Sequence, residues 1–267
     1  MTAINHQAPI ERLQSAFTKA AGSTGISFDF LVKTAARESG FQSSAKAKTS
    51  SAAGMFQFIE QTWLGVVARH GARHGLANEA AAIERQPNGR YSVKPGAVRN
   101  QILGLRHDSG LSTIMAAELA VENRNVLQSR LGRAPTDTEL YSAHFLGAGK
   151  AGNLLLAAKN SPDQDASKLF PKEAAANKPI FFGSDGTARS VSQVLEELGR
   201  LHQNQPGSIP DVGLEDAPKI TVSGGRPVSH RIAGGLVRSS LLQLSPVMVQ
   251  LLAELSAPGA AKRSDKN

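Results

Sequence analysis

Glu38 is the residue of this sequence whose type and position could most readily do chemistry. It stands at the end of an amphipathic pattern over residues 27–39, just before Gly40, as expected for the last turn of a helix. The negative end of a helix dipole disfavours a charged carboxylate there by roughly 0.3–1 kcal/mol. A carboxyl group that stays protonated near neutral pH can donate a proton to a leaving oxygen, as glycoside cleavage requires. On spacing alone, a solvated glutamate at a helix end remains the simpler explanation.

The helix that must position this acid has clear boundary signals. Ser27 is a good N-cap, and Gly40 a good C-terminal stop. Phe41, Phe56 and Phe58, if folded over the carboxyl group, would disfavour its charged form further by desolvation. The apolar face of the helix is formed by residues at helical spacing, namely Phe28, Leu31, Val32, Ala35 and Ala36.

The remaining elements are mostly helical. Residues 111–131 predict a second helix, and residues 139–146 a third, which follows the helix-entry signal Pro-Thr-Asp at 135–137. Residues 84–108 contain turn dipeptides in polar surroundings and predict a long loop or small flap. Strand signals are scarce, with one short candidate at residues 179–182. The fold class predicted is therefore mainly α.

Composition limits the possibilities. The chain has 267 residues, of which 40% are hydrophobic, enough for one core plus a tail or second small unit. The absence of cysteine excludes disulfides, thiol nucleophiles and thiolate zinc sites. A net charge of +8 favours polyanionic partners such as nucleic acid, anionic lipid or the peptide carboxylates of cell walls. The sequence has no dense Lys/Arg block with interleaved aromatics, which weakens the case for a nucleic-acid partner. It also has no apolar run of about 20 residues, so no membrane span is predicted.

Two stretches carry a resemblance to a known family. They are Arg-Glu-Ser-Gly-Phe at residues 37–41 and Lys-Thr-Ser-Ser-Ala-Ala-Gly-Met-Phe-Gln-Phe at residues 48–58. Together they resemble the soluble lytic transglycosylases, lysozyme-like enzymes that act on peptidoglycan. The family's third motif, Ala-Tyr-Asn-x-Gly, appears altered as Ala-His-Phe-Leu-Gly at residues 143–147. The likeness covers roughly residues 25–160. Residues 139–141, 169–171 and 181–182 extend it to about residue 200, toward alphaproteobacterial members tied to flagellar or cell-envelope remodelling.

The resemblance implies a mechanism with one acid. Glu38 would protonate the bond between N-acetylmuramic acid and N-acetylglucosamine. It would then act as a base as the muramic 6-hydroxyl closes on C1, giving a 1,6-anhydro sugar without consuming water. The substrate-binding residues implied are the neighbours of Glu38 in the three motifs, with His144 in the place of the aromatic residue that flanks the acid. They are Ser39, Met55, Gln57, His144 and Phe145. No metal or cofactor is implied.

The altered third motif leaves other outcomes open. If the 6-hydroxyl is not held correctly, water attacks instead, and the protein is a hydrolytic muramidase with Glu139 or Asp137 as second carboxylate. A different class is a non-catalytic scaffold that holds glycan for an envelope or flagellar machine. A nucleic-acid-binding protein is favoured by charge only.

The sequence predicts a division into an N-terminal segment (1–24), the lysozyme-like domain (25–200), a flexible linker (201–232) and a C-terminal helix with a polar tail (233–267). The C-terminal region is a candidate for binding a flagellar or envelope protein. The family implies a periplasmic location, although residues 1–9 show no signal peptide.

Three further patterns are given plain structural explanations. The G-x-G-x-x-G run at residues 147–152 follows a helix rather than a strand, so we expect a helix–helix turn instead of a dinucleotide site. His70 and His74 have the spacing of zinc ligands but no third ligand, so we expect a solvated helix face. Trp63, the only tryptophan, is expected in the core rather than in a sugar cleft.

Overall fold

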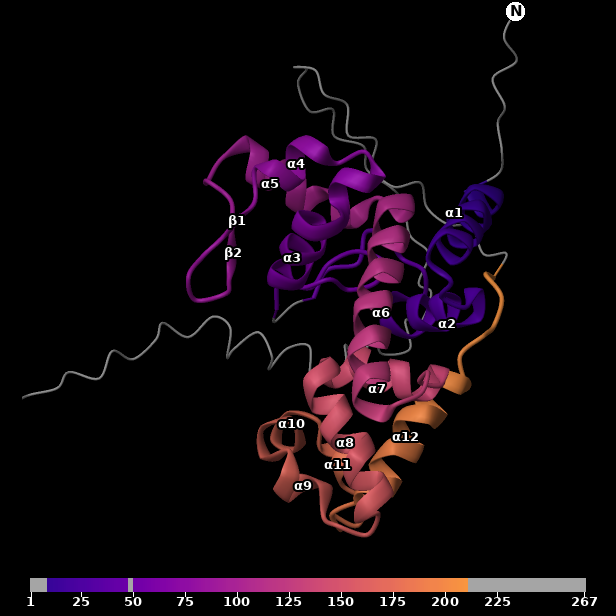
Figure 1. Cartoon of the computed structure of the whole chain (residues 1–267). Coiled ribbons are helices and arrows are strands. Elements are labelled where there is room, and N and C mark those ends of the chain that lie inside the picture. The colour runs from indigo at the N-terminus through magenta and orange to yellow at the C-terminus, as the bar shows by residue number, and fades with distance from the viewer. Residues whose placement is uncertain (1–8, 48–49, 211–267) are drawn as a thin grey trace, which may run out of the picture.

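The computed structural model describes residues 9–47 and 50–210, and within them the protein is mainly helical, as the sequence predicts (Figure 1). The elements are α1 (Pro9–Thr24), α2 (Phe28–Ser39), α3 (Glu60–His70), η1 (Gly71–His74), α4 (Ala77–Ala81), β1 (Glu84–Arg85), β2 (Tyr91–Ser92), α5 (Ala97–Gly104), η2 (Leu105–His107), α6 (Ser109–Leu131), α7 (Asp137–Leu146), α8 (Ala148–Asn160), α9 (Ala166–Leu169), α10 (Pro171–Ala176), α11 (Lys178–Phe181) and α12 (Val191–Gln203).

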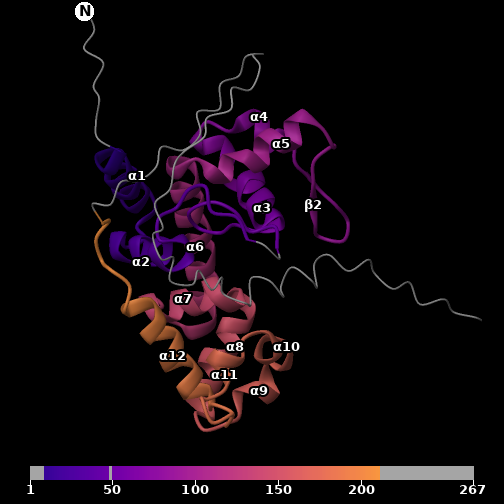
Figure 2. The ribbon, with the colours of Figure 1, turned by 180° about the vertical axis from the view of Figure 1, so that it is seen from behind.

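The long helix α6 runs through the middle of the molecule and separates two groups of elements (Figures 1 and 2). The upper lobe, residues 60–107, contains α3 to η2 with the β1–β2 hairpin. The lower lobe, residues 137–203, contains α7 to α12. Helices α1 and α2 lie beside α6 on the side away from the hairpin. Apolar side chains from both lobes and from α1, α2 and α6 join in one core.

Helix α2 has the boundaries that its sequence predicts. The Ser27 side chain accepts a hydrogen bond from the Phe30 amide at 3.0 Å and caps the first turn. Gly40 ends the helix in the left-handed conformation at φ 60°, where a side chain would be strained. These two local signals place Glu38 in the last turn, one residue before the end of α2.

The helices predicted from residues 111–131 and 139–146 are also confirmed, as α6 and α7. Asp108 caps α6 by accepting from the Leu111 amide, and Gly132 ends it. At the start of α7 the Thr136 side chain accepts from the Glu139 amide while the Glu139 carboxylate accepts from the Thr136 amide. This capping box explains why the helix begins where the sequence indicates.

The N-terminal helix is part of the domain rather than the separate segment predicted over residues 1–24. Helix α1 packs against α6 and α2, and Leu13, Phe17 and Ala20 are buried in the common core. The Phe17 ring lies against the rings of Phe41 and Phe56, with centroids 6.4 and 5.9 Å apart. The core therefore needs α1 to cover the apolar side of the α2 region.

Two other local predictions differ from the structure in part or in full. Residues 84–108, predicted as a long loop or small flap, form the β1–β2 hairpin, the helix α5 and the turn η2, so the long loop is wrong and the small flap is the alternative that agrees with the structure. Residues 179–182, predicted as a strand, mostly form the short helix α11, which has Pro179 in its first turn. A proline there already has a helical φ and lacks an amide that the first turn would leave unpaired, so it favours helix entry.

The predicted boundary at residue 200 falls inside α12, which continues to Gln203. The predicted linker beyond residue 210 and the predicted C-terminal helix (233–267) lie outside the described residues. Among the helices of the described part, none combines the length and apolar character that crossing a membrane requires.

Candidate active site

Glu38 is buried at the boundary between α2 and α7, with only 4% of its surface exposed. Its Oε1 atom lies 3.2 Å from Nε2 of His144, which is in the last turn of α7. The two residues are 106 positions apart in the chain, and the packing of the lower lobe on α2 brings them together. The structure therefore places His144 beside the acid, at the position that the altered third motif indicates.

Tyr141, one turn before His144 on α7, also lies near the acid. Burial raises the pKa of its phenol, and the negative charge of Glu38 raises it further. The positive charge of Arg37 and its hydrogen bond to Tyr141 act in the opposite direction. The phenol is therefore neutral at physiological pH, between the buried carboxyl group and the guanidinium.

A column of three rings backs the site. The rings of Tyr141 and His144 are stacked with centroids 5.8 Å apart, and those of Tyr141 and His202 with centroids 4.7 Å apart. His202 belongs to α12 and is 1% exposed. Its burial lowers its pKa to about 4, with a smaller contribution from the charge of His144, while a hydrogen bond to the Phe30 carbonyl opposes the shift. At neutral pH His202 is thus uncharged.

The loop over residues 50–58 closes the other side of the site, and two predicted substrate-binding side chains hold it in place. The Ser39 hydroxyl donates to the Met55 carbonyl at 2.8 Å. The Gln57 amide nitrogen donates to the Gly54 carbonyl at 2.7 Å and to the Ala45 carbonyl at 3.3 Å. Gln57 has a positive φ of 47°, so this hydrogen-bonded loop holds a strained backbone.

Ser39, Met55 and Gln57 are therefore directed into the protein. Each is at most 1% exposed. One atom remains free, because Oε1 of Gln57 is buried and has no hydrogen-bond partner among the described residues. Residues 48 and 49, which the sequence motif includes, lie outside the described residues.

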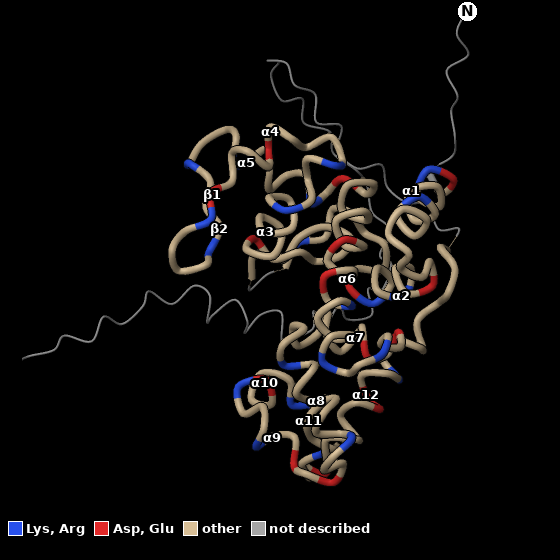
Figure 3. The backbone as a smooth tube through the Cα atoms, in the orientation of Figure 1, with Lys and Arg blue, Asp and Glu red and all other residues tan. Residues whose placement is uncertain are grey.

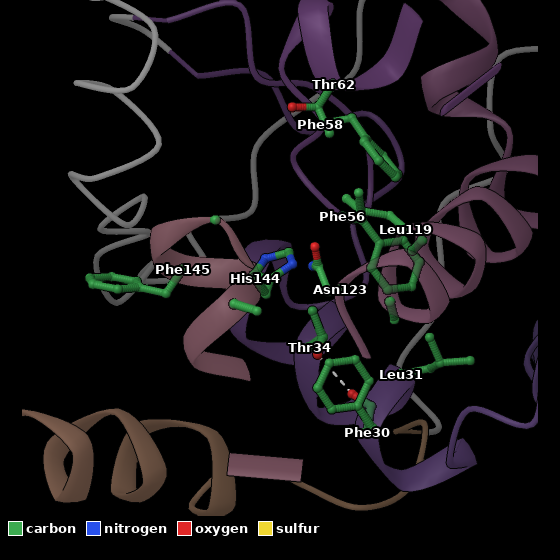
Figure 4. A pocket seen from close by; sticks show the side chains of 14 residues that line it. Phe30, Leu31, Thr34, Phe56, Phe58, Thr62, Leu119, Asn123, His144 and Phe145 are labelled. Carbon is green, nitrogen blue, oxygen red and sulfur yellow. Dashed lines mark hydrogen bonds between the residues drawn. The ribbon is translucent and has the colours of Figure 1, made fainter. Parts of the chain in front are cut away.

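His144, the partner of Glu38, lines a cavity of about 130 Å³ between the two lobes, whereas Glu38 itself is not among the residues that line it. Figure 4 shows His144 and Asn123 beside each other in this view, with Thr62 of the upper lobe and Phe58 of the preceding loop on one side and Phe30 and Thr34 of α2 on the other. Phe145 also lines the cavity, but its ring is directed away from His144. The lining is mostly apolar and contains no aspartate or glutamate.

Several site residues were not predicted. Asn123 is in register with apolar residues of α6, and a polar amide on that face is the signal that could have identified it. Tyr141 lies in a segment that carries the resemblance, but no role was predicted for it. Thr34 and His202 offered no local signal, because their place at the site depends on how α2, α7 and α12 pack together.

The two predicted second carboxylates lie elsewhere. Asp137 interacts with Ser27, at the opposite end of α2 from Glu38, about 16 Å away at 1.5 Å per residue. Glu139 is bound to Arg133, at 2.6 and 2.8 Å, and to the start of α7. The hydrogen bonds from Arg133 hold the pKa of Glu139 below its ordinary value. A separation of about 5–9.5 Å is needed for two-carboxylate glycoside cleavage, so Asp137 is too far away and Glu139 is committed to its own partners.

The histidine pair in the upper lobe differs from its prediction. His74 lies in η1 rather than in α3, so the two residues do not share one helix face. Both are half-buried and face α6, where His74 contacts Glu118 at 2.7 Å and His70 contacts Glu122. The predicted solvated face is instead a polar contact between the upper lobe and α6. No group of three or more metal-ligating side chains is found in residues 9–47 and 50–210.

The other two structural explanations are confirmed. Trp63 is fully buried and its indole nitrogen donates to the Ile102 carbonyl at 2.8 Å. Gly147 forms the turn between α7 and α8 at φ 77°, so the G-x-G-x-x-G run is a helix–helix connection.

Compared with models of known protein families, the chain matches none. The geometry around Glu38 and the sequence motifs are therefore the basis for a functional proposal.

Proposed function

We propose that the protein is a peptidoglycan lytic transglycosylase that cleaves glycan strands with Glu38 as its catalytic acid. The observation that carries the proposal is the environment of Glu38: its buried carboxyl group lies 3.2 Å from His144, and the cavity that His144 lines has no aspartate or glutamate that could act as a second carboxylate. Chemistry that needs only one carboxyl group fits this arrangement better than chemistry that needs two.

In the proposed reaction the Glu38 carboxyl group donates its proton to the glycosidic oxygen as the bond from this oxygen to the muramic C1 breaks. The carboxylate that remains then accepts the proton of the muramic 6-hydroxyl, whose oxygen forms the new bond to C1. The acid is regenerated, and the product is a 1,6-anhydro sugar. Because the nucleophile belongs to the substrate, neither water nor a second protein carboxylate takes part.

His144 would orient the acid and support its charged form. With its proton on Nε2, the imidazole donates to Oε1 of Glu38 and stabilises the carboxylate that exists between the two steps. The stack on Tyr141 fixes the plane of the imidazole. We therefore assign to His144 the role of the aromatic residue that flanks the acid in the family.

The proposal also covers the substrate, the location and the partner of the protein. Glycan strands are the proposed substrate, the periplasm is the proposed location, and the region after residue 232 is proposed to bind a flagellar or envelope protein. That region lies outside the described residues.

Digestion of purified peptidoglycan by the wild type and by Glu38→Gln, with products resolved by mass spectrometry, tests the proposal. Glu196→Gln is a matched control, because this glutamate is exposed on α12. We expect anhydro-muropeptides from the wild type and the control, and none from Glu38→Gln. Reducing ends in place of anhydro products would make the protein a hydrolytic muramidase. Binding without cleavage by any of the three would favour a scaffold.

A further inference from the structure

The β1–β2 hairpin carries three cations that have no partner in the described part of the chain. Arg85, Arg90 and Lys94 make no side-chain hydrogen bond or ion pair with any residue in 9–47 or 50–210. Figure 3 shows Lys and Arg positions in blue near β1 and β2, and the sequence of the hairpin also contains Glu84. We call residues 84–94 the basic hairpin.

The other arginines of the upper lobe are all engaged. Arg99 is paired with Glu60 at 2.6 Å, and Arg106 donates to the carbonyls of Leu103, Ser51 and Phe58. The two remaining ones bind glutamates of α6: they are Arg69, which pairs with Glu122, and Arg73, which pairs with Glu118. The unpaired charge of the upper lobe is thus concentrated on the hairpin.

The basic hairpin is fixed to the upper lobe rather than hanging free. The Gln61 side chain forms two hydrogen bonds with the backbone of Tyr91, at 2.9 and 3.0 Å. The Tyr91 ring packs so closely on Gly65 that a Cβ there would lie 2.8 Å from it, and its hydroxyl accepts from Arg69 at 2.7 Å. Because the hairpin backbone is held in place, binding a ligand through its long side chains costs less entropy.

These contacts also connect the hairpin to α3, the helix that contributes Thr62 to the cavity. Gln61, which holds Tyr91, directly precedes Thr62, and Thr62 lines the cavity that His144 shares. The hairpin projects from the upper lobe away from α1 and α2 (Figures 1 and 2). A glycan strand long enough to run from the cavity along α3 would reach the basic hairpin.

We propose that Arg85, Arg90 and Lys94 bind the carboxylates of the short peptides carried by the muramic acid residues of the strand. The proposal rests on the proposed function, and it assigns a preference for peptide-bearing strands over strands from which the peptides have been removed. In a peptide-bearing strand the lactyl carboxyl group of each muramic acid is in amide linkage to its peptide, so the negative charge available to these cations is carried by the peptides.

The test uses the full chain with Glu38→Gln as the parent, so that the strands are not cut during the assay. The hairpin variant adds Arg85→Gln, Arg90→Gln and Lys94→Gln. The control variant adds Lys19→Gln, Lys159→Gln and Lys178→Gln, which remove the same charge from exposed positions outside the upper lobe. Binding is measured at two salt concentrations by retention on sacculi immobilised on beads through their sugar hydroxyl groups. The stripped material is treated on the beads with an amidase, which removes the peptides, and its freed lactyl carboxyl groups are then converted to neutral amides.

We expect the hairpin variant to bind intact sacculi about tenfold more weakly than the parent, because each exposed ion pair adds only a few-fold to affinity. The variant should also show a weaker salt dependence, and the control variant should bind like the parent. On stripped sacculi all three proteins should bind equally. Equal binding of parent and hairpin variant to intact sacculi would overturn the proposal, as would an equal loss by the control variant.

The proposed function fails in a different way. A parent that binds neither intact nor stripped sacculi would contradict the assignment of glycan as the substrate. A parent that binds both materials equally well would leave glycan binding in place and overturn only the role of the basic hairpin.

Discussion

The buried imidazole of His202 should make the protein less stable in acid, and the substitution His202→Phe should remove this effect. Phenylalanine keeps a ring between Phe30 and Tyr141, where the His202 ring has centroid distances of 5.2 and 4.7 Å. No donor is left without an acceptor, because the Thr34 hydroxyl still donates to the Phe30 carbonyl at 2.8 Å. What disappears is the titrating group.

The magnitude follows from the pKa of His202, which burial lowers from 6.5 to about 4 in the folded protein. Above about pH 7.5 the imidazole is neutral in both states and contributes no pH dependence. As the pH falls through 6.5, the unfolded chain takes up a proton that the folded protein accepts only near pH 4, so the free energy of unfolding decreases. Between pH 7.5 and 4.5 the loss should be about 2.5 kcal/mol, at about 1.36 kcal/mol per pH unit of unequal protonation.

Urea unfolding followed by circular dichroism, with both proteins measured at pH 7.5 and 4.5, provides the assay. Carboxylates and other histidines contribute the same pH dependence to both proteins, so the difference between their losses isolates His202. The variant should lose about 2.5 kcal/mol less than the wild type. Equal losses would show that His202 is not buried as a neutral ring, and the reasoning about the ring column would be refuted.

Three further substitutions have expected outcomes. His144→Phe keeps the stack on Tyr141 but removes the contact with Glu38, so the rate of anhydro-sugar formation should fall about 100-fold in product assays; a rate within twofold of the wild type would exclude the assigned role. Gly54→Ala places a Cβ 1.9 Å from the Arg106 carbonyl oxygen at φ 80°, so chemical denaturation should show a loss of roughly 3 kcal/mol, and a neutral effect would contradict the loop geometry. Thr136→Ala removes the capping box of α7 and should lower the free energy of unfolding by about 1 kcal/mol in the same assay. An unchanged free energy of unfolding would show that the cap is absent.

The parts of the fold that sequence predicts well are those with local causes. Ser27, Gly40 and Thr136 act within one helical turn, and their side-chain or backbone preferences fix where α2 and α7 begin or end. Glu38 could be identified as a candidate for the same reason, because its place in the last turn of the helix depends only on the nearby Gly40.

What the sequence could not supply depends on contacts between distant segments. His202 and Phe17 approach the α2 region from opposite ends of the described chain, and no periodicity in the sequence indicates that approach. The same holds for Asp137 and Glu139, whose carboxylates have suitable chemistry but are directed to Ser27 and Arg133. Their exclusion from the site required three-dimensional positions.

The arrangement around α2 has a consequence for biosynthesis. The helix that carries Glu38 is contacted by α1, the first described element, and by α12, the last. Residues up to His202 must therefore leave the ribosome before the ring column behind the acid can form. A nascent chain, or a fragment that ends before α12, contains Glu38 without the surroundings that the complete domain gives it. If this acid cuts the cell wall, its activity is withheld until translation of the domain is finished.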